Sequence, residues 1–170
     1  MRRVVIFGNS GSGKSTLARG LGAKLALPVI HLDQLFWNPD WRMSCREEFA
    51  DKQRRALADA RDGWVCEGNY FNTLDLRLPQ ADTIIVLDIP LARCLWNVLK
   101  RWSYSKGQVR PDGPRGCPDK MDFAFIRWVW GYSRHSRPLI EFAVEEYGLG
   151  KSVIRLSSHA TARTFLASVA

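Results

Sequence analysis

The feature that most restricts the fold is a glycine-rich loop placed between an apolar run and an amphipathic run. Residues 3–7 read Arg-Val-Val-Ile-Phe, which is typical of a buried strand, and residues 8–15 follow directly as Gly-Asn-Ser-Gly-Ser-Gly-Lys-Ser. The next segment places its apolar residues on one helical stripe: Leu17, Ala18, Leu21 and Leu25. A strand, a tight glycine turn and a helix in this order predict the first unit of a parallel α/β sheet.

The loop satisfies the pattern G-x-x-x-x-G-K-[ST], and it stands where that pattern requires, after a strand and before a helix. Glycines let successive backbone N–H groups turn toward phosphate oxygens, and the helix N-terminus adds its positive end. Lys14 would reach the β- and γ-phosphates and act in catalysis, and the Ser15 hydroxyl would bind Mg²⁺. The sequence therefore predicts an ATP·Mg²⁺ site formed by Gly8, Ser10, Gly11, Ser12, Gly13, Lys14, Ser15 and Thr16.

Strand-like and helix-like patterns alternate along the rest of the chain, which predicts one domain over residues 1–170 with helices on both faces of a parallel sheet. The further strands are expected at 29–32, 64–66, 82–87 and 153–156. The further helices are expected at 44–60, 91–102, 121–147 with a break near Pro138, and 160–169. Ser44 with Glu47 three residues later is expected to form a capping box.

Composition excludes several classes of protein. Hydrophobic residues make up 46% of the chain, enough for one sizeable core, yet no apolar run approaches the roughly 20 residues that span a bilayer. The four cysteines, Cys45, Cys66, Cys94 and Cys117, have wide, irregular spacing that fits no zinc template. We therefore expect a soluble cytoplasmic protein with free thiols.

Carboxylates follow three of the expected strands, namely Asp33, Glu67 and Asp88. The carboxyl ends of parallel strands meet at one edge of a sheet, which is where ligands bind. In phosphoryl transfer one acid commonly orients a metal-bound water and another the acceptor hydroxyl. We expect Glu67 to act at the metal and Asp33 in catalysis, although each acid could equally cap a helix or hold a turn.

A basic region follows the fourth helix. The net charge is +8, and residues 100–137 hold nine basic residues against three acidic ones. Within it, residues 103–120 contain three prolines and three glycines, which favours a mobile lid over a merely disordered loop. Because guanidinium groups neutralise a moving phosphoryl well, the catalytic candidates here are Arg101, Arg110, Arg115, Arg134 and Arg137. A solvated basic surface is the alternative interpretation.

Two aromatic-rich segments allow more than one interpretation. Residues 35–42, Leu-Phe-Trp-Asn-Pro-Asp-Trp-Arg, could stack on an acceptor with Arg42 pairing an acidic group, or form a hydrophobic plug, which we favour. The aromatic residues between 123 and 130 cover nearly all faces of one helix, which indicates buried core or a dimer contact.

Several motifs together resemble the adenylate-kinase-like P-loop proteins, and more narrowly the bacterial DNA topology modulation protein family, which is related to nucleoside monophosphate and shikimate kinases. The motifs are the phosphate loop, His31-Leu32-Asp33, Glu67-Gly68-Asn69-Tyr70, Leu87-Asp88-Ile89-Pro90, Arg110-Pro111-Asp112 and Gly116-Cys117-Pro118. The resemblance implies a three-layer P-loop NTPase fold with strand order 2-3-1-4-5 and a lid. It also implies that Asp33 lies near the acceptor, and that Glu67 stands where such kinases usually have an Asp holding a metal-bound water.

Two functions follow from these features. The first is transfer of the ATP γ-phosphoryl group to a small acceptor, such as a nucleotide or a hydroxyl metabolite. The alternative is an ATP-dependent regulatory or nucleic-acid-binding protein that modulates DNA topology, which the basic charge permits. A GTPase is disfavoured because DxxG followed by NKxD does not occur. Either function is compatible with a monomer or a homodimer without a membrane partner.

Overall fold

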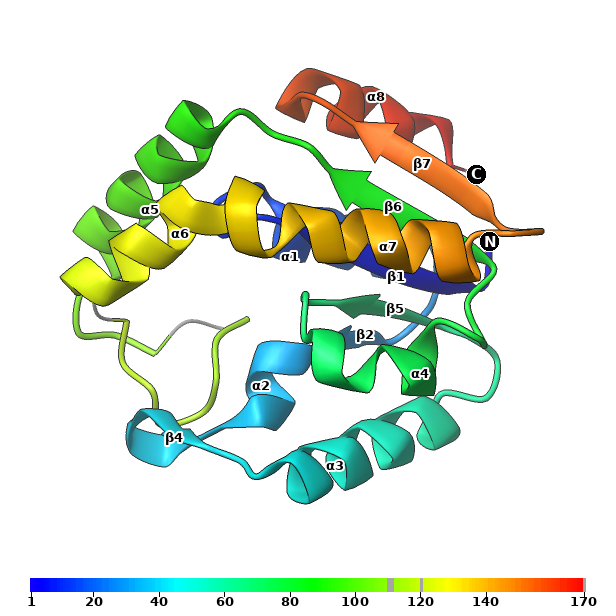
Figure 1. The fold of residues 1–170 in the computed structure, drawn as a ribbon, viewed down its shortest axis with the longest axis horizontal. Helices are drawn as coiled ribbons and strands as arrows, with labels where there is room; N and C mark the ends of the chain where they lie inside the picture. Colours follow the sequence, from blue (N-terminus) through cyan, green and yellow to red (C-terminus); the bar gives the residue numbers. More distant parts are fainter. Residues whose placement is uncertain (110–111, 120, 170) are drawn as a thin grey trace.

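A computed structural model describes residues 1–109, 112–119 and 121–169. Five parallel strands form its central sheet (Figure 1): β1 (Arg3–Gly8), β2 (Val29–His31), β5 (Trp64–Glu67), β6 (Thr83–Leu87) and β7 (Ser152–Leu156). Their order is β2-β5-β1-β6-β7. The predicted order 2-3-1-4-5 is confirmed, and β1 lies at the centre of the sheet.

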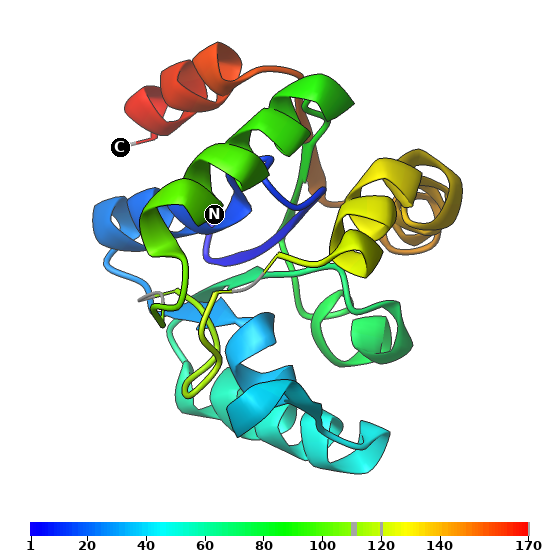
Figure 2. The ribbon, with the colours of Figure 1, turned by 90° about the vertical axis from the view of Figure 1, so that its left-hand side faces the viewer.

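Helices cover both faces of the sheet, as predicted. The helices α1 (Lys14–Leu25) and α8 (His159–Ser168) pack on one face, with part of α5 (Leu91–Ser105). The helices α3 (Arg46–Asp59), α4 (Leu74–Arg77), α6 (Phe123–His135) and α7 (Arg137–Tyr147) contribute to the core on the other face. Figure 2 shows α6 and α7 across the sheet from α1 and α8.

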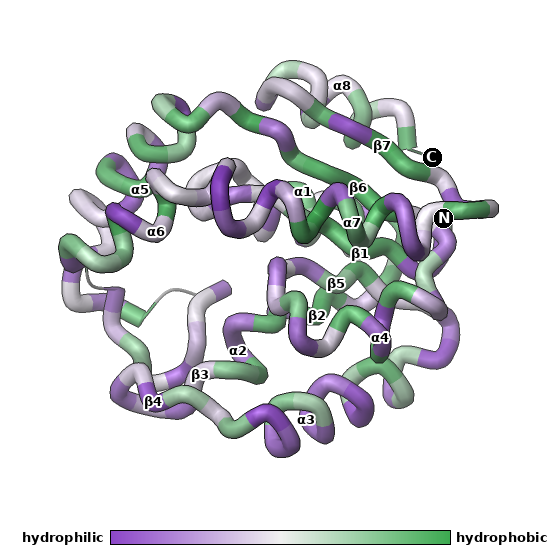
Figure 3. The backbone as a smooth tube through the Cα atoms, viewed as in Figure 1, coloured by the Kyte–Doolittle hydropathy of each residue, from purple (hydrophilic) through white to green (hydrophobic). Residues whose placement is uncertain are grey.

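The two cores follow from the period of two along a strand. In β1, Val4 and Ile6 belong to the core beneath α1, while Val5 and Phe7 belong to the core beneath α6 and α7. A central strand buried on both faces must be apolar along its whole length. Figure 3 shows this for β1 and β6, in contrast to the hydrophilic residues along α3. Within the described ranges, every helix is too short or too polar to cross a membrane.

The structure adds short elements that periodicity does not predict. After β2 come α2 (Leu32–Phe36) and a hairpin of β3 (Trp37–Asn38) and β4 (Arg42–Met43), joined by the 3₁₀ turn η1 (Pro39–Trp41). A second 3₁₀ turn, η2 (Phe71–Thr73), precedes α4. Elements of two to five residues are shorter than the window in which a helical or strand period can be recognised.

Two predicted boundaries differ from the structure, and a third agrees with it. The expected Ser44 cap is wrong: the N-cap of α3 is Cys45, whose Sγ accepts a hydrogen bond from the Glu48 backbone N–H at 3.4 Å. Ser44 is buried instead, and its hydroxyl accepts a hydrogen bond from Lys52 Nζ at 3.2 Å. The helix α5 continues to Ser105, three residues into the expected lid. The predicted break near Pro138 is confirmed, since α6 ends at His135 and α7 begins at Arg137.

Candidate active site

The phosphate loop has the backbone conformation that its glycines permit. Gly11 and Gly13 have φ values of 78° and 95°, in the left-handed region that favours glycine. At Gly11 a Cβ atom would lie 2.2 Å from the Cys94 carbonyl oxygen, so no other residue fits there. Gly13 is the N-cap of α1 and offers no side-chain cap. The first turn of α1 thus presents N–H groups that suit a phosphate.

A cleft of about 1310 Å³ opens over this loop. The predicted nucleotide-binding residues line this cleft, with the exception of Gly8, which ends β1. Asp33, Glu67 and Arg101 line the cleft as well. Further lining residues come from α6 and α8. The strand ends, the loop and the helices after it therefore meet in one cavity, as expected for the carboxyl edge of a parallel sheet.

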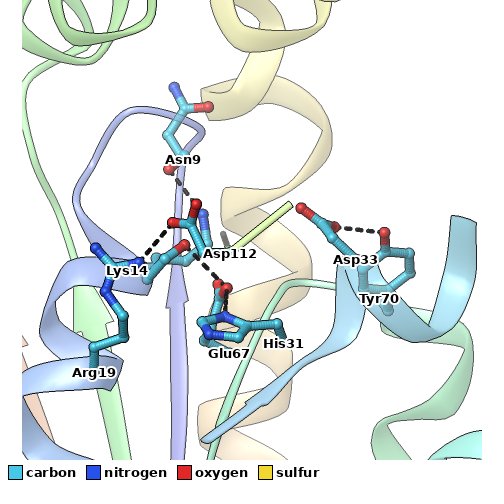
Figure 4. A network of polar contacts seen from close by, with 9 residues as sticks. Asn9, Lys14, Arg19, His31, Asp33, Glu67, Tyr70 and Asp112 are labelled. Carbon is cyan, nitrogen blue, oxygen red and sulfur yellow. Dashed lines mark hydrogen bonds and ion pairs between the residues drawn. The ribbon is translucent and has the colours of Figure 1, made fainter. Parts of the chain in front are cut away.

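Lys14 is held along the loop by a residue that the sequence did not single out. Its Nζ donates a hydrogen bond to the Asn9 carbonyl oxygen at 2.9 Å (Figure 4). The Asn9 side chain in turn accepts from the Ser10 N–H at 2.8 Å and donates to the Val129 carbonyl oxygen in α6 at 3.0 Å. Asn9 thereby fixes both the curvature of the loop and its distance from α6. A variable position of the loop pattern carries no signal of this role.

A buried network joins the loop to two strands. Ser15 Oγ donates to Glu67 Oε1 at 3.0 Å, and His31 Nδ1 lies 2.8 Å from the same oxygen. Burial raises the pKa of Glu67, but the hydrogen bond from His31 and the charge of Lys14 outweigh it and hold this pKa below its ordinary value. Glu67 is therefore a carboxylate, which can only accept, so His31 Nδ1 carries the hydrogen. Figure 4 shows His31 and Glu67 facing one another below Lys14.

The Ser15 hydroxyl and the Glu67 carboxylate fit a magnesium ion. Both are oxygen donors, and Mg²⁺ usually takes one or two protein oxygens while phosphates and waters complete its octahedron. Within residues 1–109, 112–119 and 121–169 no three His, Cys, Asp or Glu side chains gather as a metal-binding group. Ser15 and Glu67 could supply two oxygens to an ion beside the phosphates.

Glu67→Gln is expected to raise the Mg²⁺ concentration needed for half-maximal ATP turnover by about tenfold or more, because the neutral amide orients metal-bound water less well. A titration of Mg²⁺ at saturating ATP measures this. Glu47→Gln, at an exposed position of α3, is the matched control and should leave the titration unchanged. An identical Mg²⁺ dependence in Glu67→Gln would remove Glu67 from the metal site.

The second carboxylate, Asp33, lies at the start of α2 on the far side of this network in Figure 4. Tyr70 donates its hydroxyl hydrogen to Asp33 Oδ1 at 2.6 Å. Burial, with the negative charge of Asp33 next, raises the pKa of Tyr70 well above its ordinary range, so the phenol stays a donor. Tyr70 therefore fixes the orientation of the Asp33 carboxylate at the edge of the cleft.

A buried arginine supports the loop that carries Tyr70. Arg77 is 0% exposed and donates to the carbonyl oxygens of Gly68, Asn69, Tyr70 and Thr73 at 3.0–3.4 Å. Its guanidinium also lies over the Phe7 ring, 5.9 Å from the centroid. Sequence reasoning missed it, because an arginine at the end of a short helix ordinarily faces solvent.

Arg77→Met is expected to lower the free energy of unfolding by about 3 kcal/mol, because buried carbonyl groups lose a charged donor without gaining water. Urea unfolding measures the change. Arg54→Met, which removes an exposed arginine paired with Asp51, is the control and should cost less than about 0.5 kcal/mol. Equal unfolding midpoints for the two variants would contradict the supporting role of Arg77.

Two solved structures share this architecture. Shikimate kinase from Acinetobacter baumannii in complex with shikimate superposes with a TM-score of 0.54 at 14% identity, over 99% of this chain and 90% of its own. A protein described as a “putative kinase” from Chloroflexus aurantiacus has a TM-score of 0.57 at 16% identity, over 98% and 95% of the two chains. The chain shares the fold of these two structures. No protein-family model and no curated protein matches the sequence.

The structure places the predicted arginines in different surroundings. Arg101 lines the cleft, while Arg115 and Arg134 are exposed and do not line it. Arg137 lies 2.9 Å from Asp88, and both line a separate cavity of about 250 Å³. Arg110 lies outside the described residues. The structure thus brings together Lys14, Ser15, Asp33, Glu67 and Arg101.

The aromatic segments agree with expectation only in part. Leu35 and Phe36 pack against the core, as the plug interpretation predicts, whereas Trp37 and Trp41 line the cleft. Arg42 is exposed and donates to the Pro39 carbonyl oxygen. The α6 helix is not buried all round: Phe123 and Trp130 are exposed, and the cleft is lined instead by Phe125 and Trp128. A dimer contact through the exposed residues stays a prediction.

Proposed function

We propose that this protein is an ATP·Mg²⁺-dependent phosphotransferase that moves the γ-phosphoryl group of ATP to the hydroxyl of a small acceptor. One observation carries the proposal: Asp33 opens into the same cleft as the Lys14, Ser15 and Glu67 network. A phosphate cradle, a pair of metal-binding oxygens and a second carboxylate are the parts that phosphoryl transfer requires.

Each residue of this site then has a part in the proposed reaction. The loop N–H groups and Lys14 hold the β- and γ-phosphates, and Ser15 with Glu67 holds the metal. Bound Mg²⁺ neutralises phosphate charge. Tyr70 orients Asp33, which takes the proton of the acceptor hydroxyl. As this proton leaves, the oxygen of the acceptor hydroxyl bonds to the γ-phosphorus. The bond from the γ-phosphorus to the bridging oxygen breaks at the same time, and ADP leaves.

Among the arginines predicted to act on the moving phosphoryl group, Arg101 is the best placed, because it lines the cleft and the others described do not. It projects from α5 into the cleft, and its Nε lies 3.9 Å from Asp119 Oδ2. Charge spreads over the equatorial oxygens in the transition state, where bidentate guanidinium contacts are strongest. The other predicted candidates are less well supported. Arg110 lies outside the described residues, and the cleft is not lined by Arg115, Arg134 or Arg137.

Arg101→Lys is expected to lower turnover about tenfold or more, a loss of about 1.4 kcal/mol in transition-state binding, at nearly constant ATP affinity. The charge is kept, but the planar fork is lost. Steady-state kinetics and ATP binding measured separately would show this split. Arg93→Lys, at an exposed position of the same helix outside the cleft wall, is the matched control. Full turnover in Arg101→Lys would exclude this role.

ADP release measured across a panel of small alcohols and nucleotides tests the function itself. Acceptor-dependent release supports a phosphotransferase. The alternative, an ATP-dependent nucleic-acid-binding protein, predicts instead that duplex DNA alters ATP turnover and that binding weakens steeply with salt. ATP turnover that responds to DNA and to no small acceptor would replace the present proposal with that alternative.

A further inference from the structure

The phosphate loop is held from outside by side chains of two helices that sequence reasoning did not connect with it. Asn97 Nδ2, from α5, donates a hydrogen bond to the Gly11 carbonyl oxygen at 2.8 Å. His159 Nε2, from the start of α8, lies 3.0 Å from the Ser12 carbonyl oxygen. A carbonyl oxygen only accepts, so Nε2 of His159 carries the hydrogen. Figure 2 shows both helices beside α1, whose first turn follows the loop.

Each of these two donors extends from a fixed backbone. The helix α5 passes directly against the loop, since a Cβ atom at Gly11 would lie 3.0 Å from Val98 Cγ2. The helix α8 begins with a capping box, in which the Ser158 hydroxyl accepts from the Thr161 N–H and the Thr161 hydroxyl accepts from the Ser158 N–H, both at 3.1 Å. His159 is the first residue after this cap, so its starting point is set before any nucleotide binds.

The two hydrogen bonds fix the directions of two peptide groups in the loop. A trans peptide unit carries its C=O and its N–H in opposite directions, so a donor that holds the carbonyl oxygen also aims the next N–H. After the Ser12 carbonyl that N–H belongs to Gly13, the N-cap of α1. After the Gly11 carbonyl it belongs to Ser12, which donates to the Asn9 carbonyl oxygen at 3.2 Å. Without these bonds, a loop rich in glycine would lose more conformational entropy when it orders around a phosphate.

Both side chains also line the cleft, so their position alone would equally permit a contact with the nucleotide base. The hydrogen bonds favour a different role, because each donor atom is already engaged with a carbonyl oxygen of the loop. We propose that Asn97 and His159 are positioning residues, which hold the phosphate loop in its anion-binding conformation and so set the affinity for polyphosphate whatever the base. This inference rests on the nucleotide site of the proposed phosphotransferase and identifies what preorganises that site.

Two ligands that share a phosphate chain separate this role from a contact with the base. Calorimetry measures ATP binding to the full chain with Mg²⁺, and tripolyphosphate, which has no base, is titrated as a competitor of ATP. Asn97→Leu and His159→Leu should each weaken both ligands by the same factor, about fivefold or more, because each variant removes one hydrogen bond from the loop. A loss of ATP affinity with unchanged tripolyphosphate affinity would show that the side chain contacts the base, and would overturn the inference.

Conservative variants and matched controls complete the comparison. His159→Gln keeps an N–H donor and should bind both ligands within about threefold of the unmodified protein. Leucine favours a helix more than asparagine does, so α5 should persist in Asn97→Leu, which urea unfolding checks. Ser103→Ala on α5 and Thr164→Ala on α8, at exposed positions outside the cleft, are the controls. Asn97→Ala and His159→Ala replace the leucine variants if leucine prevents folding.

Failure of this inference is distinguishable from failure of the proposed function, because the binding measurements need no acceptor. If the variants bind both ligands as the unmodified protein does while an acceptor stimulates ADP release, the phosphotransferase stands and the positioning role falls. If the variants lose affinity for both ligands while no acceptor stimulates ADP release, the positioning role stands in a protein that binds ATP without transferring it. If tripolyphosphate does not compete with ATP for the unmodified protein, the loop does not bind polyphosphate by itself and the inference is overturned.

Discussion

Lys14→Ala is expected to lower ATP turnover at least about a hundredfold and to weaken ATP binding in parallel. The ammonium group meets the β- and γ-phosphates in a water-poor cleft, and removal of one such preorganised donor costs on the order of 10²–10³ in rate. In the structure Lys14 Nζ donates a hydrogen bond to a backbone carbonyl oxygen of its own loop, that of Asn9. The fold should therefore persist.

Calorimetry and ADP release together measure this effect, with urea unfolding as the check on folding. Lys100→Ala, at an exposed position of α5 outside the cleft, is the matched control and should behave as the unmodified protein. Wild-type turnover in a folded Lys14→Ala variant would disprove the nucleotide site itself, and with it every proposal made for this cleft.

Asp33→Asn should reduce turnover by about 10²–10⁴ at nearly constant ATP affinity, because an amide keeps the shape of the side chain and cannot take up a proton. Tyr70 can still donate to the amide oxygen, so the local structure is retained. Single-turnover kinetics and ATP binding separate the two quantities. Asp62→Asn, an exposed aspartate in the turn after α3, is the control. A large loss of ATP affinity with normal turnover at saturation would show that Asp33 serves the nucleotide.

The fold and part of the site were predictable from the sequence wherever a residue pattern is compatible with a single backbone geometry. The apolar strands predicted the parallel sheet, and the spacing of the loop residues predicted a turn into α1. Placing acids at strand ends located Asp33 and Glu67 in the cleft, because parallel strands end at the same edge. These predictions depend on local periodicity and on topology, whereas the strand order was implied by the family resemblance.

The features that were missed depend on contacts between distant parts of the chain. Asn9 contacts Val129, 120 residues away, and Arg77 is buried because loop carbonyls surround it. The aromatic residues 35–42 have no period from which to predict a hairpin, so their lining of the cleft emerges only in three dimensions. Mobility of the predicted lid, residues 103–120, stays a prediction.

The bonds between the β3–β4 hairpin and residues 116–118 have a mechanical consequence. Besides two bonds that the turn η1 of the hairpin donates to the carbonyl oxygens of Gly116 and Pro118, Cys117 Sγ donates to the Asn38 carbonyl oxygen at 3.2 Å. Three hydrogen bonds thus tie the segment after α5 to the hairpin after α2, so neither can swing away alone without breaking them. Any motion that widens the cleft on this side must therefore carry the hairpin and residues 116–118 together as one unit.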